Sequence, residues 1–128
     1  MTFTFGESVA NLKSTNMISV IMPTMWQGNR AIETLKALSK YQSVGEIILI
    51  DNSETPPDLK IDKLVHIKEY KNTYVNPAWN KGYRLAKFDK LLFVNDDVQT
   101  NWGFINAFGL NTLTWNNGIG RWSYFVGF

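Results

Sequence analysis

The chain of 128 residues contains no cysteine and a single histidine, His66. The lack of cysteine excludes disulfide bonds and thiolate metal sites, and a single histidine excludes a zinc site built from several histidines. No apolar run approaches the ~20 residues that a bilayer-spanning helix needs. The N-terminus also lacks the basic segment and apolar stretch of a signal peptide. We therefore expect a cytoplasmic protein without a transmembrane segment.

The net charge is small as well. The formal net charge is +2, and the Lys and Arg residues are scattered along the chain. This balance argues against nucleic acid as a partner. The apolar fraction of 45% and the charged fraction of 19% are those of an ordinary globular protein. The length fits one domain with a real core, although it is short for a complete α/β enzyme.

Four apolar runs predict buried strands, at residues 17–22, 46–50, 64–67 and 91–94. Residues 28–41 carry apolar side chains at helical spacing, and a second helix is expected over residues 76–87, with Asn76 as its N-cap and Pro77 at its first position. Pro23 is expected to end the first strand, because it has no N–H to donate. This order predicts an α/β fold, with a mostly parallel sheet flanked by helices.

Weaker patterns lie near both ends of the chain. Residues 2–5 alternate between polar and apolar, which suits an edge strand or a packed tail. Residues 102–110 suggest a short helix, and residues 121–126 suggest a further strand.

Acidic residues follow two of the predicted strands. Asp51 comes directly after the second strand, and the adjacent pair Asp96 and Asp97 follows the fourth. Neighbouring carboxylates repel each other and are costly to desolvate, whereas hard cations such as Mg²⁺ and Mn²⁺ take oxygen ligands. Ligands of open α/β sheets bind at the carboxyl ends of the strands. The pattern therefore predicts a ligand pocket with a cation, and an acidic turn without a ligand is the alternative.

Four motifs in a fixed order resemble those of family 2 glycosyltransferases, which have the GT-A fold. They occupy residues 18–24, 46–53, 76–82 and 93–97, and they include Pro23-Thr24, Asp51-Asn52-Ser53 and Asn95-Asp96-Asp97. The resemblance implies a single, truncated or minimal GT-A-like domain over residues 1–128. Residues 1–16 would be an N-terminal extension, residues 17–98 the donor-binding core, and residues 99–128 a short remainder of the acceptor half.

The resemblance also implies a function. The chain would transfer a sugar from a nucleoside-diphosphate sugar, of the UDP or dTDP type, to a saccharide or other hydroxyl acceptor, with Mn²⁺ or Mg²⁺. Asp97 would bind the metal together with Asn95, which replaces the first acid of the family's Asp-x-Asp motif, and Asp96 is the catalytic candidate. The implied nucleotide-binding residues are Pro23, Thr24, Trp26, Asp51, Asn52, Ser53, Asn80, Lys81 and Asp96.

Several of these roles have a simpler explanation. Asp51 could accept a hydrogen bond from the imide N–H of uracil or thymine, or it could cap the turn that follows it. Lys81 and Arg84 could lie near the phosphates at the helix N-terminus, or they could be solvated helix charges. Gly82 could serve only to let the helix pack closely on the sheet.

One requirement of an inverting transferase is missing. Residues 98–128 contain no Asp, Glu or His that could deprotonate the acceptor. Three hypotheses stay open: a minimal transferase that uses Asp96, a retaining mechanism or a partner chain's residue; a piece of a longer transferase; or a binding or assembly module that transfers nothing. The aromatic side chains of this segment could stack on an acceptor sugar, but they suit core packing or a homo-oligomer interface better.

Two other enzyme classes fit less well. A phosphotransfer domain would place an acid after the first strand, where this chain has Pro23-Thr24. A dinucleotide-binding domain would have a G-x-G-x-x-G motif there, and the chain has none.

Overall fold

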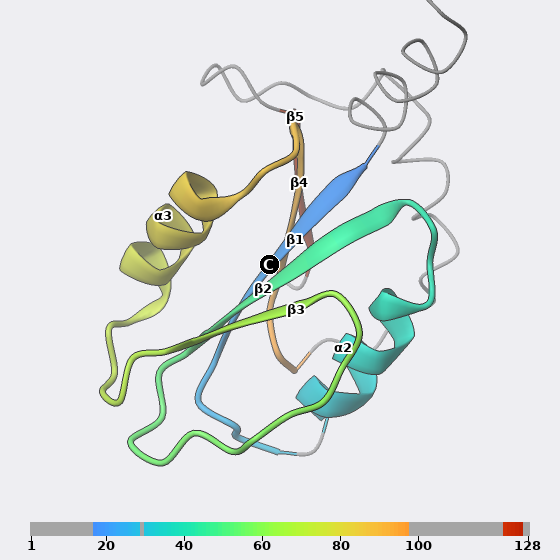
Figure 1. The fold of residues 1–128 in the computed structure, drawn as a ribbon. Helices are drawn as coiled ribbons and strands as arrows, with labels where there is room; N and C mark the ends of the chain where they lie inside the picture. Colours follow the sequence, from blue (N-terminus) through green and yellow to red (C-terminus); the bar gives the residue numbers. More distant parts are fainter. Residues whose placement is uncertain (1–16, 29, 98–121, 127–128) are drawn as a thin grey trace, which may run out of the picture.

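The computed structural model describes residues 17–28, 30–97 and 122–126 (Figure 1). Its elements are β1 (Ile18–Thr24), α2 (Arg30–Ser39), β2 (Val44–Asp51), β3 (Leu64–Lys68), α3 (Val75–Leu85), β4 (Lys90–Val94) and β5 (Trp122–Val126). The strands form one sheet in the order β3-β2-β1-β4-β5, and every neighbouring pair is parallel. The predicted α/β fold with a parallel sheet is thereby confirmed. This arrangement is common to many α/β proteins and does not single out the GT-A fold.

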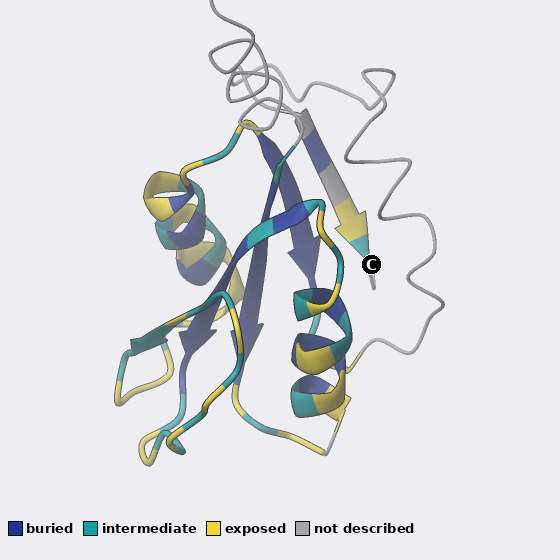
Figure 2. Ribbon diagram, turned by 45° about the vertical axis from the view of Figure 1, so that its right-hand side comes forward, coloured by how far each residue is buried: buried dark blue, intermediate teal, exposed yellow. Residues whose placement is uncertain are grey.

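The helices cover opposite faces of the sheet, α2 on one and α3 on the other (Figures 1 and 2). Helix α2 connects β1 to β2, and α3 connects β3 to β4. Leu59 and Ile61, from the connection between β2 and β3, pack against the core on the α2 side. The chain therefore moves outward from β1 on one face and returns to β4 on the other. The strand order reverses between β1 and β4, which is where ligands of open α/β sheets bind.

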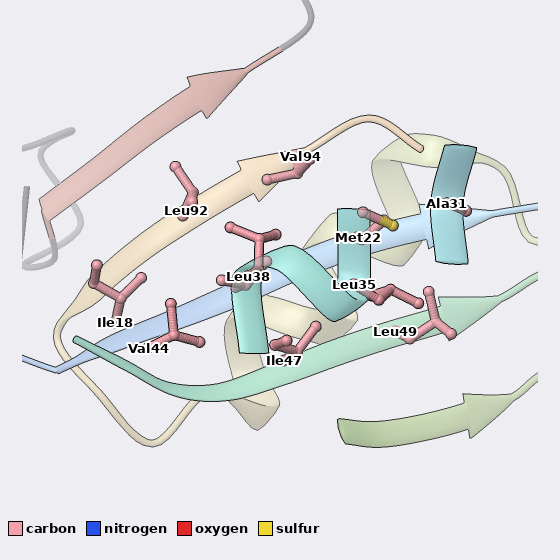
Figure 3. Packing of buried hydrophobic residues seen from close by; sticks show 11 residues of the cluster. Ile18, Met22, Ala31, Leu35, Leu38, Val44, Ile47, Leu49, Leu92 and Val94 are labelled. Atoms are coloured by element: carbon pink, nitrogen blue, oxygen red, sulfur yellow. The ribbon is translucent and has the colours of Figure 1, made fainter. Parts of the chain in front are cut away.

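The sheet is buried on both faces, because each helix covers an apolar cluster. Along β1, Val20 and Met22 belong to the cluster under α2, whereas Ile21 belongs to the cluster under α3. Figure 3 shows the cluster under α2, in which Leu35 and Leu38 lie over side chains of β1, β2 and β4. This double burial explains why the strands are apolar at nearly every position rather than at alternate ones.

Gly82 brings α3 close to the sheet. A Cβ atom at this position would lie 2.4 Å from Cγ2 of Ile21, a fully buried side chain of β1. No side chain larger than hydrogen fits without moving the helix. Close packing therefore accounts for this glycine without any role in ligand binding.

The prediction that Pro23 ends the first strand is wrong. Pro23 lies inside β1, opposite Ile50 of β2. The next residue, Thr24, turns its carbonyl toward β2 and accepts a hydrogen bond from the backbone N–H of Asn52. The backbone N–H and C=O groups of successive residues in a strand point to opposite sides, so the backbone of Pro23 faces β4. Pairing between β1 and β4 already ends at Ile21. The missing N–H of Pro23 therefore breaks no ladder bond.

The prediction that Asn76 caps α3 is also wrong. The helix begins at Val75, its N-cap residue is Tyr74, and no side chain caps it. The chain turns into the helix before Asn76, because the N–H of Tyr74 donates to Oδ1 of Asn72 at 2.8 Å. Pro77 still lies in the first turn, where a missing N–H costs nothing.

The other predicted elements can be compared only in part. The expected strand at 121–126 is confirmed as β5, which pairs in parallel with β4. The expectations for residues 2–5 and 102–110 fall outside the described residues. Within the described residues, no helix is long and apolar enough to cross a membrane.

Candidate functional site

A side-chain hydrogen bond joins the carboxyl ends of β1 and β4. Thr24 Oγ1 donates to Oδ2 of Asp96 at 2.7 Å and accepts a bond from the backbone N–H of Trp26 at 2.9 Å. Thr24 is almost completely buried, so its hydroxyl has little freedom to choose other partners. The acid predicted after the fourth strand is therefore fixed beside the carboxyl end of the first.

Asp51, at the end of β2, is enclosed by the chain's own donors. Its Oδ2 accepts from the indole N–H of Trp26 at 2.9 Å and lies 2.7 Å from Nε2 of His66. Its Oδ1 accepts from the backbone N–H and the hydroxyl of Ser53, at 3.0 and 2.7 Å. Because a carboxylate only accepts, the Nε2 atom of His66 carries the proton.

This environment keeps Asp51 ionised. Burial raises the pKa of its carboxyl, but the hydrogen bonds from Ser53, His66 and Trp26 together outweigh burial and hold the pKa below its ordinary value. The residue has 0% exposed surface. The turn-capping role that the sequence left open is thus present in the structure. Contact with a nucleotide base would require one of these donors to move, and that role stays a prediction.

A pocket of about 200 Å³ opens at this edge of the sheet. It lies beside the point where the strand order reverses, and three strand ends and the segment leading into α3 contribute to it. The lining residues are Pro23, Thr24, Met25, Gln27, Asn52, Asn72, Tyr74, Val75, Asn95 and Asp96. Side-chain amides and one carboxylate therefore meet exposed apolar groups in a single concavity.

Asn52 presents a fixed donor to this pocket. Its Oδ1 accepts from the backbone N–H and the hydroxyl of Thr73, at 3.3 and 2.6 Å, which settles the orientation of the amide. Asn52 lines the pocket, so its Nδ2 group suits an acceptor on a ligand bound there.

The N-terminus of α3 also faces the pocket, through Tyr74 and Val75. The first turn of this helix contains no acidic residue, and no side chain caps it. Its first backbone N–H groups and the positive end of the helix dipole favour an anionic group.

Four of the predicted nucleotide-binding residues line the pocket, namely Pro23, Thr24, Asn52 and Asp96, and Asn95 of the predicted metal pair lines it too. The others lie elsewhere. Trp26 and Ser53 hold Asp51, as described above. Lys81 forms an ion pair with Glu69, and Asn80 is exposed outside the pocket lining.

Asp97 is not part of the pocket lining either. It is exposed, and its backbone carbonyl lies 3.5 Å from a guanidinium nitrogen of Arg30. In the part of the chain that the structure describes, no group of three or more His, Asp or Glu side chains could hold a metal. Mg²⁺ is often held by one or two side chains together with substrate phosphates. Asn95 and Asp96 therefore suit a cation that arrives with a diphosphate better than a permanently bound one.

Sequence reasoning missed half of the lining. Met25, Gln27, Asn72, Tyr74 and Val75 were not predicted, and neither was the bond from His66 to Asp51. Some of them could have been predicted, since Asn72 to Val75 follow the carboxyl end of the third strand. Ligands of open α/β sheets bind at the carboxyl ends of the strands, and this holds for that segment as it does for the acids.

No protein-family model, no curated protein and no solved structure matches the chain significantly. The resemblance to family 2 glycosyltransferases therefore depends on the four sequence motifs alone.

Proposed function

We propose that the chain binds a nucleoside-diphosphate sugar, of the UDP or dTDP type, in this pocket and transfers the sugar to a hydroxyl acceptor. The observation that carries the proposal is the position of the pocket. It lies at the reversal of strand order, where Thr24, Asn52 and Asp96 from three strand ends meet the N-terminus of α3. Such a position suits a nucleotide in open α/β sheets.

Different groups of the pocket suit different parts of the donor. Its volume of about 200 Å³ is below the ~300–1,000 Å³ typical of sites that enclose a drug-sized ligand, so the pocket does not enclose the whole donor. The Nδ2 group of Asn52 suits a carbonyl oxygen of uracil or thymine. The N-terminus of α3 suits the diphosphate.

Mn²⁺ or Mg²⁺ is part of the proposal. Asn95 and Asp96 would hold it together with diphosphate oxygens, and the cation would stabilise negative charge on the leaving nucleoside diphosphate. Asp97, the main ligand that the resemblance implies, is exposed and would have to turn toward the pocket to take part.

Calorimetric titration with UDP, with and without Mn²⁺, tests the site. We expect binding that requires the metal and that weakens at least about tenfold in Asp96→Asn, the size of effect expected from losing a metal ligand or its support. Asp89→Asn is the matched control, since Asp89 is an exposed acid just before the opposite end of β4. Asp97→Asn shows whether that residue takes part. Equal affinity for UDP with and without metal would contradict the metal role.

Nucleotide selectivity is a second arm of the same experiment. UDP and dTDP share the carbonyl that suits Asn52, whereas the adenine of ADP has no carbonyl. We expect ADP to bind more weakly than UDP or dTDP. Comparable affinity for all three would argue for a general phosphate site.

A binding module without transferase activity is the second candidate. The lack of Asp, Glu and His in residues 98–128 favours it, because no carboxylate or imidazole of that segment can activate an acceptor. Release of UDP from UDP-sugars, followed over hours with a panel of sugar acceptors, separates the two. Tight donor binding with neither hydrolysis nor transfer would favour the module.

A further inference from the structure

Tyr74 has a backbone conformation that a side chain disfavours. Its φ is 67° and its ψ is 170°, a region that is essentially restricted to glycine. The residue is 70% exposed, so burial of the ring does not compensate for the strain. It also lines the pocket. The fold would accept glycine here more easily than tyrosine, which points to a role for the ring in binding.

Hydrogen bonds hold this conformation on both sides. The N–H of Tyr74 donates to Asn72, and its carbonyl accepts from the N–H of Ala78 at 3.2 Å. The preceding residue, Thr73, is anchored by two bonds to the buried amide of Asn52. The position of Tyr74 is therefore determined before any ligand binds, and the residue that anchors it also lines the pocket.

The neighbours of Tyr74 suit a flat ligand with a polar edge. Met25 and Val75 are exposed apolar residues in the lining, and Asn52 and Asp96 supply polar groups. We propose that Tyr74 stacks on the base of the nucleotide bound in this pocket, and that Asn52, through Thr73, is its positioning residue. This inference rests on the proposed function, to which it adds the residue that recognises the ring.

The test compares two probes on four proteins. UDP and pyrophosphate are titrated with Mn²⁺ into the wild type, Tyr74→Phe, Tyr74→Ala and Tyr74→Gly. Tyr74→Phe should bind UDP within about twofold of the wild type, and the Ala and Gly variants should bind it about tenfold more weakly, as expected for a lost base stack. Pyrophosphate has no base, so its affinity should stay within about twofold in all four.

Thermal unfolding distinguishes the effect of losing the Tyr74 ring from the effect of relieving the backbone strain. Tyr74→Gly and Tyr74→Ala both lack the ring, but only glycine adopts this backbone conformation freely. The Gly variant should therefore melt a few degrees above the Ala variant. It also keeps the binding test valid if the Ala variant does not fold.

Each outcome decides the proposal. Undiminished UDP affinity in the Gly variant would overturn stacking, and so would an equal loss for UDP and pyrophosphate, since that result indicates a displaced helix N-terminus. A wild type that binds no UDP would instead contradict the proposed function, and this inference with it.

Discussion

The hydroxyl of Thr24 donates a 2.7 Å hydrogen bond to Asp96, a residue 72 positions further along the chain. Backbone pairing between β1 and β4 stops at Ile21 and Phe93. The side-chain bond thus extends the link between these strands beyond their ladder and into the pocket. At the opposite end of β1, Ser19 makes a similar 2.6 Å bond to the buried carboxylate of Glu46, far from the pocket.

Replacing Thr24 with valine keeps the shape of the side chain but removes the bond to Asp96. We expect the free energy of unfolding to fall by about 1–3 kcal/mol, because the partly buried N–H of Trp26 also loses its acceptor. UDP affinity should fall as well, since Asp96 is no longer held. Urea denaturation and calorimetric titration measure the two effects.

Two control variants accompany Thr24→Val. Thr24→Ser retains the hydroxyl and should retain most of the UDP affinity. Ser19→Ala removes the corresponding buried hydroxyl at the far end of β1, so it should lower stability by a similar amount and leave UDP affinity unchanged. Loss of UDP binding in Ser19→Ala would show that any weakening of β1 disturbs the pocket.

The buried carboxylate of Asp51 should make stability depend on acid pH. Its folded-state pKa lies below the ordinary value of about 3.9, because hydrogen bonds outweigh the effect of burial. The stability that this group contributes is fully present above about pH 4 and is lost as the pH falls through the folded-state pKa. Urea denaturation between pH 7 and pH 2.5 should show this decline.

Asp51→Asn supplies the comparison. At pH 7 this variant should be less stable than the wild type by about 1–3 kcal/mol, because an amide cannot accept from all the donors that surround the carboxylate. Its stability should then fall less steeply below pH 4. Parallel curves for the two proteins would show that Asp51 does not cause the acid loss.

Gly82→Ala tests the contact between α3 and the sheet. The added Cβ would lie 2.4 Å from Cγ2 of Ile21, and this buried branched side chain has no room to withdraw. We expect a loss of about 1–3 kcal/mol from overpacking, despite the better helix propensity of alanine. Asn80→Ala, at an exposed position of the same helix, gains propensity without the clash and should not lose stability. Circular dichroism with urea measures both.

Lys81→Ala should leave UDP affinity within about twofold of the wild type. The ammonium group of Lys81 is paired with Glu69, and the residue does not line the pocket. A partly exposed ion pair contributes only ~1 kcal/mol or less to stability, so the variant should also fold normally. A loss of UDP binding of tenfold or more would show that Lys81 leaves Glu69 to contact the phosphates, as the resemblance implies.

Local patterns in the sequence were enough to predict most elements of this fold. The apolar runs that became β1, β2 and β4 are continuous because both faces of each strand are covered, and the helical spacing of Ala31, Leu35 and Leu38 predicted α2. The polar residues at the strand ends could also be read directly. Parallel strands bring such residues to one edge of the sheet, whatever their order.

Local patterns do not predict which of these residues meet, because that depends on the order of the strands in the sheet. Strand order depends on the face that each connection crosses, and no local pattern records that choice. The arrangement of the strands brings Asp96 to Thr24, and it places Asp51 between Trp26 and His66. The two acids looked alike in the sequence, but one lines a pocket and the other is buried, because a carboxylate's role depends on donors that come from distant parts of the chain.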